Sequence, residues 1–402
     1  MKRSAAIIGF LLCCVPLTTG ADWREFRGPG HRSIAEKQTV PTVWDEASGI
    51  AWKQNLPGRA VSSPIVVGGR VITTSASGVR SERLHVFALD AGSGKQLWHR
   101  QFWATGRTQC HPFSSIAAPT PASDGKQIYA FFASNDLICL DLDGNLKWLR
   151  GLTHDYPTAA NDVGMSSSPC VIGDTVIVQV ENLVHSFAAG IDTATGVERW
   201  KIQRPARMNY VSPTLVGGSG GDKAPHILLQ SPTLLSAHDP RTGKQLWSYV
   251  SEFRSIVSPL AVDGILYARA DQGITAISRK SSTAESEVLW SQPKLSPTSS
   301  SPLVYRGRIY GLNRTGVLTC ADIADGTVQW QLRLKGPFWA TPVVVGNLLY
   351  CINHDGLTQV VELGKKGKII ARNQLSDKVY GSPAIANNAL YIRSEHALWM
   401  IQ

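Results

Sequence analysis

Short apolar segments rich in Val, Ile, Leu and Tyr recur along the chain and are separated by turn residues at regular intervals. The pattern is clearest between Ser212 and Trp247, where a Ser-Pro pair precedes three apolar segments and a fourth ends on Trp247. Runs of this length bounded by turns predict β-strands. The residues from Asp239 to Gly243, before the fourth strand, favour a turn. The Asp carboxylate can accept hydrogen bonds from the turn's own amides, and Gly tolerates positive φ.

The same four-strand unit repeats eight times. Each copy follows a proline, and in seven of the eight copies a hydroxyl residue stands directly before this proline. These pairs are Ser63-Pro64, Ala118-Pro119, Ser168-Pro169, Ser212-Pro213, Ser258-Pro259, Ser301-Pro302, Thr341-Pro342 and Ser382-Pro383. Six units end on a tryptophan, namely Trp98, Trp148, Trp200, Trp247, Trp290 and Trp330. Four-stranded repeats of roughly 40–55 residues predict the blades of a β-propeller. We interpret the small hydroxyl residues as side chains that fit a crowded axis, because no Gly-x-Ser-x-Gly elbow marks any of them as a nucleophile.

The eighth unit stops at Gln402 after three strands, and an isolated strand-like segment from Ile50 to Leu56 carries the missing tryptophan, Trp52. We therefore predict an all-β, eight-bladed β-propeller over residues 50–402, whose ring is closed by this N-terminal strand. Closure in this way leaves no free sheet edge. Residues 22–49, with an aromatic and basic start, are predicted to be a lead-in segment that packs on the body of the propeller.

The first 21 residues have the pattern of a signal peptide. Lys2 and Arg3 precede an apolar run, Ala5 to Leu17, that is too short to cross a bilayer, and small residues follow up to Ala21. Leu12 stands before Cys13, where a lipoprotein signal needs a small residue, so we expect a periplasmic or secreted protein without a lipid anchor. We expect no transmembrane helix, since no later run is long and apolar enough.

The chain is basic, with a formal charge of +10, and removal of the signal peptide would leave about +8. Its Lys and Arg residues are scattered and not clustered, which together with export argues against nucleic acid as a partner. The five cysteines after the signal peptide have no metal-ligand or redox spacing. Two pairs in neighbouring repeats, Cys139 with Cys170 and Cys320 with Cys351, are candidates for disulfides.

Two connections between blades are longer than the rest, and we expect both on one face of the ring. They are the first insert, residues 99–117, and the second insert, residues 149–167. Long loops on a rigid scaffold commonly carry binding residues, although these loops could also simply cap the ring. The candidate binding residues in the inserts are His111, His154, Asp155, Tyr156, Asn161 and Asp162. Three further candidates stand five residues before a repeat proline, where they could place positive charge at one mouth of the channel: Arg59, Arg254 and Lys378.

The pattern Ala-x-Asp-x-x-Thr-Gly-x-x-x-Trp, complete from Ala237 to Trp247, resembles the tryptophan-docking motif of quinoprotein-type (PQQ-like) eight-bladed propellers. The opening Trp23-Arg-Glu-Phe-Arg-Gly-Pro also resembles secreted bacterial members of this superfamily. One branch consists of alcohol dehydrogenases that bind pyrroloquinoline quinone (PQQ) and calcium and usually have a disulfide between adjacent cysteines. The other is non-enzymatic, like the BamB-type propeller of the outer-membrane β-barrel assembly machinery, which presents loops to a partner.

The chain has no adjacent cysteines outside the signal peptide, and the calcium ligands of the enzymes find no counterpart residue by residue. We therefore predict a non-catalytic binding or scaffold propeller, a monomer without a cofactor, that binds a protein or a cell-envelope glycan through one face. The alternative is a PQQ- and calcium-dependent alcohol or sugar dehydrogenase. Neither the partner nor the disulfide pairing follows from the sequence.

Overall fold

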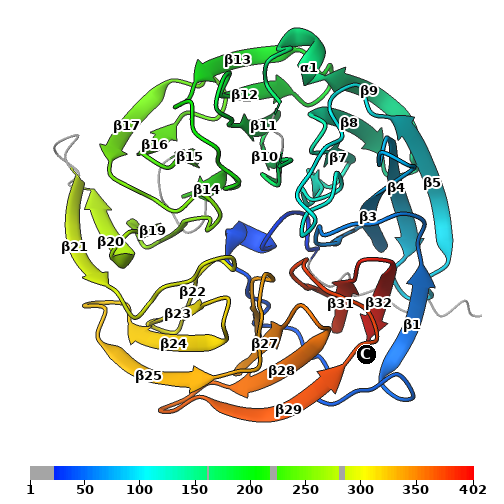
Figure 1. The fold of residues 1–402 in the computed structure, drawn as a ribbon. Coiled ribbons are helices and arrows are strands. Elements are labelled where there is room, and N and C mark those ends of the chain that lie inside the picture. The colour runs from blue at the N-terminus through cyan, green and yellow to red at the C-terminus, as the bar shows by residue number, and fades with distance from the viewer. Residues whose placement is uncertain (1–21, 161–162, 218–223, 280–285) are drawn as a thin grey trace, which may run out of the picture.

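The computed structural model describes residues 22–160, 163–217, 224–279 and 286–402. Within them, 32 strands form eight four-stranded antiparallel sheets, which are arranged as the blades of a ring around a central axis (Figure 1). The predicted all-β, eight-bladed propeller is confirmed. Among these residues no helix is of a length and apolarity that would let it cross a membrane.

Each blade runs outward from an innermost short strand to an outermost one. The first four blades consist of β2 (Ile65–Val67), β3 (Arg70–Ser77), β4 (Arg83–Asp90) and β5 (Gln96–Trp103); β6 (Ala122–Ser123), β7 (Gln127–Phe131), β8 (Asp136–Asp141) and β9 (Leu146–Gly151); β10 (Cys170–Ile172), β11 (Thr175–Val180), β12 (Phe187–Asp192) and β13 (Glu198–Gln203); and β14 (Thr214–Val216), β15 (His226–Gln230), β16 (Leu234–His238) and β17 (Gln245–Val250). Two short helices, η1 (Pro29–His31) and α1 (Leu152–Asp155), lie in the lead-in segment and the second insert.

The remaining blades complete the ring. They consist of β18 (Leu260–Val262), β19 (Ile265–Ala270), β20 (Gly273–Arg279) and β21 (Ser286–Gln292); β22 (Leu303–Tyr305), β23 (Arg308–Leu312), β24 (Val317–Asp322) and β25 (Val328–Arg333); β26 (Val343–Val345), β27 (Leu348–Ile352), β28 (Leu357–Glu362) and β29 (Lys368–Gln374); and β30 (Ala384–Ala386), β31 (Ala389–Arg393), β32 (Ala397–Ile401) and β1 (Ile50–Asn55). Strand β1 pairs antiparallel with β32, Lys53 opposite Trp399, so the N-terminal strand closes the eighth blade as predicted.

The tryptophans tie each blade to the next. Trp98 Nε1 donates to the carbonyl of Leu142 in the following blade (2.9 Å), and Trp52 does the same to Ala91 across the closure (3.2 Å). The Trp52 ring packs on Gly94, which has φ +70°, and a Cβ there would lie 2.5 Å from the ring. Only Gly serves at this position, because it supplies both the positive φ and the close approach. This explains the spacing of Gly and Trp in the repeat.

The hydroxyl residues at the starts of the innermost strands form a closed ring of hydrogen bonds around the axis. In each blade the backbone amide of this hydroxyl residue donates to the side-chain oxygen of the corresponding residue in the next blade, over 2.9 to 3.2 Å. We call this set the hydroxyl ring; its members in the described chain are Ser63, Thr120, Ser168, Ser212, Ser258, Ser301, Thr341 and Ser382. All eight side chains are buried. The structural interpretation of these hydroxyls is thus supported by a specific interaction.

One repeat anchor is corrected by this ring. Ala118 and Pro119 are the predicted second anchor, but the residue in the ring is Thr120, followed by Pro121 and strand β6. Pro119 and Pro121 stand two positions apart, and both fit the local pattern of the repeat. With Pro121 as the anchor, every blade of the described chain has a hydroxyl residue before its proline.

The lead-in segment runs through the central channel and not merely along the outside of the body (Figure 1). Trp23 exchanges two backbone hydrogen bonds of 2.8 Å with Val66 of the first blade. Arg27 is buried and donates from Nη1 and Nη2 to the carbonyls of Pro259 (2.9 Å) and Pro302 (3.0 Å), on the fifth and sixth blades. Further on, Ala35 donates to Val344 of the seventh blade (2.8 Å). The segment therefore occupies the axis and contacts several blades at once.

The predicted disulfide candidates are wrong. The five cysteines after the first 21 residues, all in the described part of the chain, are free: Cys110, Cys139, Cys170, Cys320 and Cys351. Cys139 and Cys320 lie on the third strands of their blades and Cys170 and Cys351 on first and second strands of the next. All four are buried within the sheets, where they serve as small apolar side chains.

The hydroxyl ring predicts a specific loss of stability. Thr120→Val keeps the shape of the side chain but removes the acceptor of the buried Ser63 amide. An unpaired buried amide costs about 1–3 kcal/mol, so we expect the free energy of unfolding to fall by about that amount in urea denaturation. Ser299→Ala is the control, since the structure gives its hydroxyl no hydrogen bond among the described residues, and should change stability by less than about 0.5 kcal/mol. Equal losses in both variants would contradict a role for the ring.

Candidate functional site

A cavity of about 440 Å³ lies on the axis, and we call it the cup. Its wall includes all eight members of the hydroxyl ring. Phe26 of the lead-in segment contributes to its lining, and its neighbour Arg27 lies buried beyond it, against the fifth and sixth blades. The cup is therefore closed at one end and opens on the face that carries the two inserts.

A second register of the repeat lines the mouth of the cup. Each residue three positions before a repeat proline faces the cavity, because alternate residues of an extended segment point the same way. The eight residues in this register are Val61, Ala118, Ser166, Tyr210, Ile256, Ser299, Trp339 and Tyr380. The first three blades contribute small side chains, and there the inserts add His111, Phe113, Val163 and Met165 to the lining. The lining is therefore mainly apolar and hydroxyl-bearing.

An aromatic cluster with one arginine forms one side of the mouth. Trp339 lies 5.6 Å from Tyr380 and 5.5 Å from Phe113, measured between ring centroids, and His354 lies 4.9 Å from Tyr380. The guanidinium of Arg314 stacks 4.0 Å from the centre of the Trp339 ring. Since Phe113 belongs to the first insert and the others to the sixth to eighth blades, this insert reaches across the mouth. We call these five residues the aromatic rim.

Hydrogen bonds fix the polar groups of the aromatic rim. The Tyr380 hydroxyl lies 2.8 Å from His354 Nε2, and His354 Nδ1 lies 2.9 Å from the Asp355 carboxylate. Burial raises the pKa of the Tyr380 hydroxyl, so it is protonated at neutral pH and can donate to the imidazole. Phe113, by contrast, is 47% exposed. The rim thus presents an oriented aromatic surface to solvent.

The two inserts contact each other, as expected for loops on one face. His111 N donates to the carbonyl of Val163 (3.1 Å), and a Cβ at Gly164 would lie 2.8 Å from Cys110 Cβ. His111 lines the cup, and its Nδ1 accepts from the amide of Phe113 (3.1 Å). Of the candidate insert residues, His111 is the one that the structure places at the cup.

The other candidates of the second insert lie elsewhere. His154 and Asp155 are exposed on α1, where Asp155 pairs with Arg150. The Tyr156 hydroxyl donates to Glu198 (2.5 Å) on the outermost strand of the third blade, and burial and this hydrogen bond raise its pKa. Asp155 and Tyr156 thus tie the start of the second insert to the outer part of the ring. Asn161 and Asp162 lie outside the described residues.

The three basic candidates differ in what they do. Arg59 makes an ion pair with Glu395 (2.6 Å) and donates to the carbonyl of Ser114 in the first insert. Arg254 pairs with Asp271 (3.2 Å), and Lys378 is exposed. None of the three lines the cup, whereas Arg314 does.

The aromatic rim was missed because four of its five residues, all except Phe113, stand in connections of ordinary length. The signal was available, however, since Trp339 and Tyr380 share the register three positions before the proline. The candidates Arg59 and Lys378 came instead from the register five positions before the proline. The residues one and three positions before each proline line the cup, because alternate residues of an extended segment point the same way.

The donor set of the cup does not fit a calcium-bound quinone. Calcium takes six to eight oxygen ligands, usually with carboxylates among them. None of the described residues that line the cup is an Asp or a Glu. The hydroxyl oxygens of the ring already accept backbone hydrogen bonds, and Phe26 and Arg27 occupy the axis. The chain's own residues therefore offer no calcium site there.

An eight-bladed ring with tryptophan-docked blades and an axial cup defines the class of PQQ-like propellers. The chain matches the family model described as outer membrane protein assembly factor BamB over residues 30–206, 156–296 and 282–368, and it belongs to this family.

Individual relatives extend this result. The chain is 26% identical to outer membrane protein assembly factor BamB of Moranella endobia (strain PCIT) over 306 residues, which is 74% of this chain and 70% of the relative. The crystal structure of BamB from Moraxella catarrhalis has a TM-score of 0.63 at 18% identity, with 88% of this chain and 97% of that chain covered. Quinohemoprotein alcohol dehydrogenase from Comamonas testosteroni has a TM-score of 0.69 at 13% identity, with 94% and 80% covered. At these identities the two structures show the shared fold alone.

The contacts of Arg59 indicate that this residue attaches the first insert to the ring. Arg59→Ala removes the ion pair with Glu395 and the hydrogen bond to Ser114, so the insert should detach locally from the ring. We expect trypsin to cleave after Arg107 about tenfold faster, as the loss of about 1.4 kcal/mol of local stability implies. Lys378→Ala is the matched control, since Lys378 stands in the same register but is exposed. Equal cleavage rates in the wild type and the Arg59 variant would contradict this role.

Proposed function

We propose that this chain is a non-catalytic scaffold of the cell envelope, exported to the periplasm or beyond, which binds a partner protein through the face that carries the cup. Its family membership supports a role in outer-membrane protein assembly, because that is the role named for its relatives. The observation that carries the proposal is the aromatic rim, an oriented and partly exposed surface beside an apolar cup.

The chemistry of the rim favours a protein segment. Aromatic side chains and arginine dominate the binding energy of protein interfaces, particularly where they surround a pocket that excludes water. The Trp339 ring is held between Arg314 and Tyr380, so it loses little conformational freedom when a partner binds. The cup can take an apolar side chain, and Arg314 can pair with a carboxylate next to it. We therefore expect an extended segment that carries both.

Several features support a non-catalytic role. The hydroxyls of Ser168 and Ser212 accept backbone hydrogen bonds within the hydroxyl ring. His111 Nδ1 accepts from a backbone amide, which leaves the imidazole oriented by its own loop. A nucleophilic serine needs a neighbouring base, and the geometry of the cup gives these serines a structural partner instead.

The dehydrogenase alternative is supported by fold similarity, which does not determine function. It predicts that the purified protein takes up PQQ with calcium and reduces a dye in the presence of an alcohol. Given the absence of acidic residues from the described lining of the cup, we expect no calcium-dependent uptake. Stoichiometric uptake with dye reduction would contradict the scaffold proposal.

The test is complementation in the organism of origin. A strain without the gene receives the wild type, the double variant Phe113→Ala/Trp339→Ala, or Trp103→Ala, and the folded outer-membrane proteins are quantified. A hot-spot truncation costs about 2 kcal/mol or more, so the double variant should bind at least roughly tenfold more weakly and fail to restore their level. Trp103 is 63% exposed on the outermost strand β5, so Trp103→Ala is a matched aromatic control and should restore it.

The partner is identified by photocrosslinking from position 113, with position 103 as the control. A protein crosslinked from position 113 and lost in Trp339→Ala supports the proposal. If a purified envelope glycan binds in a Trp339-dependent manner and the level of outer-membrane proteins is unaffected, the partner is a glycan and the proposal of a protein partner is contradicted. Point substitutions are preferable to removal of the first insert, because residues 99–103 belong to β5 and Ile116 and Ala117 are buried in the core.

A further inference from the structure

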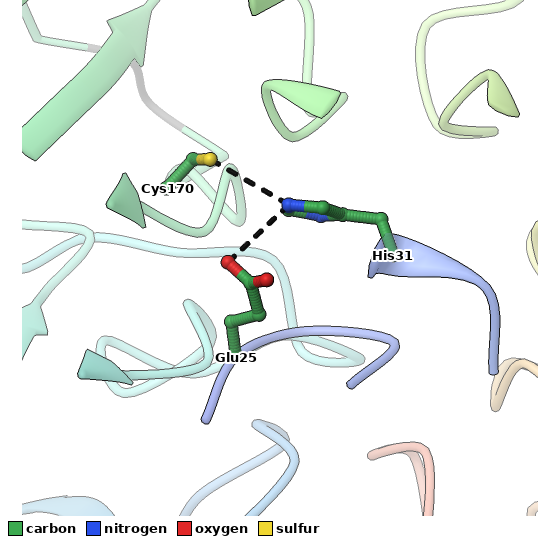
Figure 2. Close-up of side chains that lie close together, drawn as sticks. All are labelled: Glu25, His31 and Cys170. Carbon is green, nitrogen blue, oxygen red and sulfur yellow. Dashed lines mark hydrogen bonds and ion pairs between the residues drawn. The ribbon is translucent and has the colours of Figure 1, made fainter. Parts of the chain in front are cut away.

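Beneath the cup, the lead-in segment meets the third blade at three side chains with metal-binding donor atoms. Figure 2 shows Glu25, His31 and Cys170, with the imidazole pointing between the carboxylate and the sulfur. His31 Nε2 lies 3.2 Å from Glu25 Oε2 and 3.6 Å from Cys170 Sγ. One donor atom from each residue lies within 4.8 Å of the others. His31 and Cys170 are buried, and the Glu25 side chain is 18% exposed.

These distances correspond to the edges of a tetrahedron of zinc ligands. Zinc binds imidazole nitrogen at about 2.0–2.1 Å, thiolate sulfur at about 2.3 Å and carboxylate oxygen at about 2.0–2.2 Å. With tetrahedral angles, those bond lengths place nitrogen and sulfur about 3.6 Å apart and nitrogen and oxygen about 3.4 Å apart. The distances from His31 Nε2 are close to both values, so the three ligands need little movement to enclose the ion.

The charges of the three groups also balance a divalent ion. In the free protein, burial and the nearby Glu25 carboxylate raise the pKa of the Cys170 thiol, which therefore stays neutral. A zinc ion would stabilise the thiolate, and one thiolate, one carboxylate and a neutral imidazole bring the charge of the site to zero. A buried site without net charge avoids most of the desolvation cost. The nearby cation on the lead-in segment, Arg27, is directed to carbonyls of the fifth and sixth blades.

A second group of donors in the described residues is a weaker candidate. Asp377, Glu395 and His396 also lie within reach of one ion. Glu395, however, already makes the ion pair with Arg59, and His396 is 63% exposed. The Glu395 carboxylate there has a partner, and the exposed His396 imidazole lies 3.4 Å from the Asp377 carboxylate.

We propose that Glu25, His31 and Cys170 bind one Zn²⁺, with a water molecule as the fourth ligand, and that this ion fastens the lead-in segment to the third blade. Glu25 and His31 come from the segment and Cys170 from strand β10 (Figure 2). The ion would thus join two parts of the chain that are about 140 residues apart and fix the segment that closes the cup. This proposal does not depend on the identity of the partner.

The test measures zinc in the full chain, purified without a metal-binding tag, loaded with zinc and dialysed against zinc-free buffer. We expect close to one zinc per chain in the wild type and a loss of at least tenfold in affinity in both His31→Gln and Cys170→Ala. Cys351→Ala, which removes an equally buried thiol in the seventh blade, and His111→Gln are the matched controls and should retain zinc. A wild type that retains none, or equal retention in all variants, would overturn the proposal.

Cobalt substitution tests the ligands directly, even where a variant is less stable. Co²⁺ in the wild type should give the absorption of a tetrahedral ion and a thiolate-to-cobalt charge-transfer band, and Cys170→Ala should lack that band. Removal of the metal with a chelator should lower the thermal midpoint of the wild type and of Cys351→Ala, but not that of Cys170→Ala. Cobalt bound without a thiolate band would show that Cys170 is not a ligand and would equally overturn the proposal.

Discussion

The hydroxyl ring around the axis is the interaction on which the geometry of this propeller depends. Eight innermost strands converge there, and each must satisfy a buried amide at the point where the chain turns into the blade. A hydroxyl on the neighbouring blade supplies the acceptor, so every blade fixes the position of the next. Because the last bond runs from Ser382 to Ser63, the set is closed, and no blade can shift without a cost at two seams.

Different positions of the repeat determine the shape of the ring and the residues that are available for binding at its mouth. Small hydroxyl residues occupy the first position before each repeat proline, whereas the third position varies from Ser166 to Trp339. Where the first three blades have small residues in this position, the inserts fill the space. Where the seventh and eighth blades have Trp339 and Tyr380, the connections stay short. The rim is therefore asymmetric although the ring beneath it is regular, and an asymmetric rim can bind one partner in one orientation.

The regular part of the molecule could be predicted from sequence because the same local chemistry recurs in each blade. The turn from Asp239 to Gly243 and the orphan strand around Trp52 determine the blade and the closure. The second anchor was misplaced because Pro119 and Pro121 both fit the local pattern, and the amide of Ser63, 57 residues away, distinguishes them. The aromatic rim brings Phe113 to Trp339, from blades far apart in the chain. Such a contact has no local signature, and neither does the passage of the lead-in segment through the channel.

The course of the lead-in segment also sets the direction in which the molecule faces. Asp22 accepts a hydrogen bond from Gly68, in the turn at the end of β2 that is remote from Ser63 and the hydroxyl ring. Asp22 thus lies on the side of the ring opposite the open cup. A fusion, a surface or a support attached at that point would hold the aromatic rim outward. Asp22, where the described chain starts, is consequently the point at which to immobilise this protein when its binding face has to remain accessible.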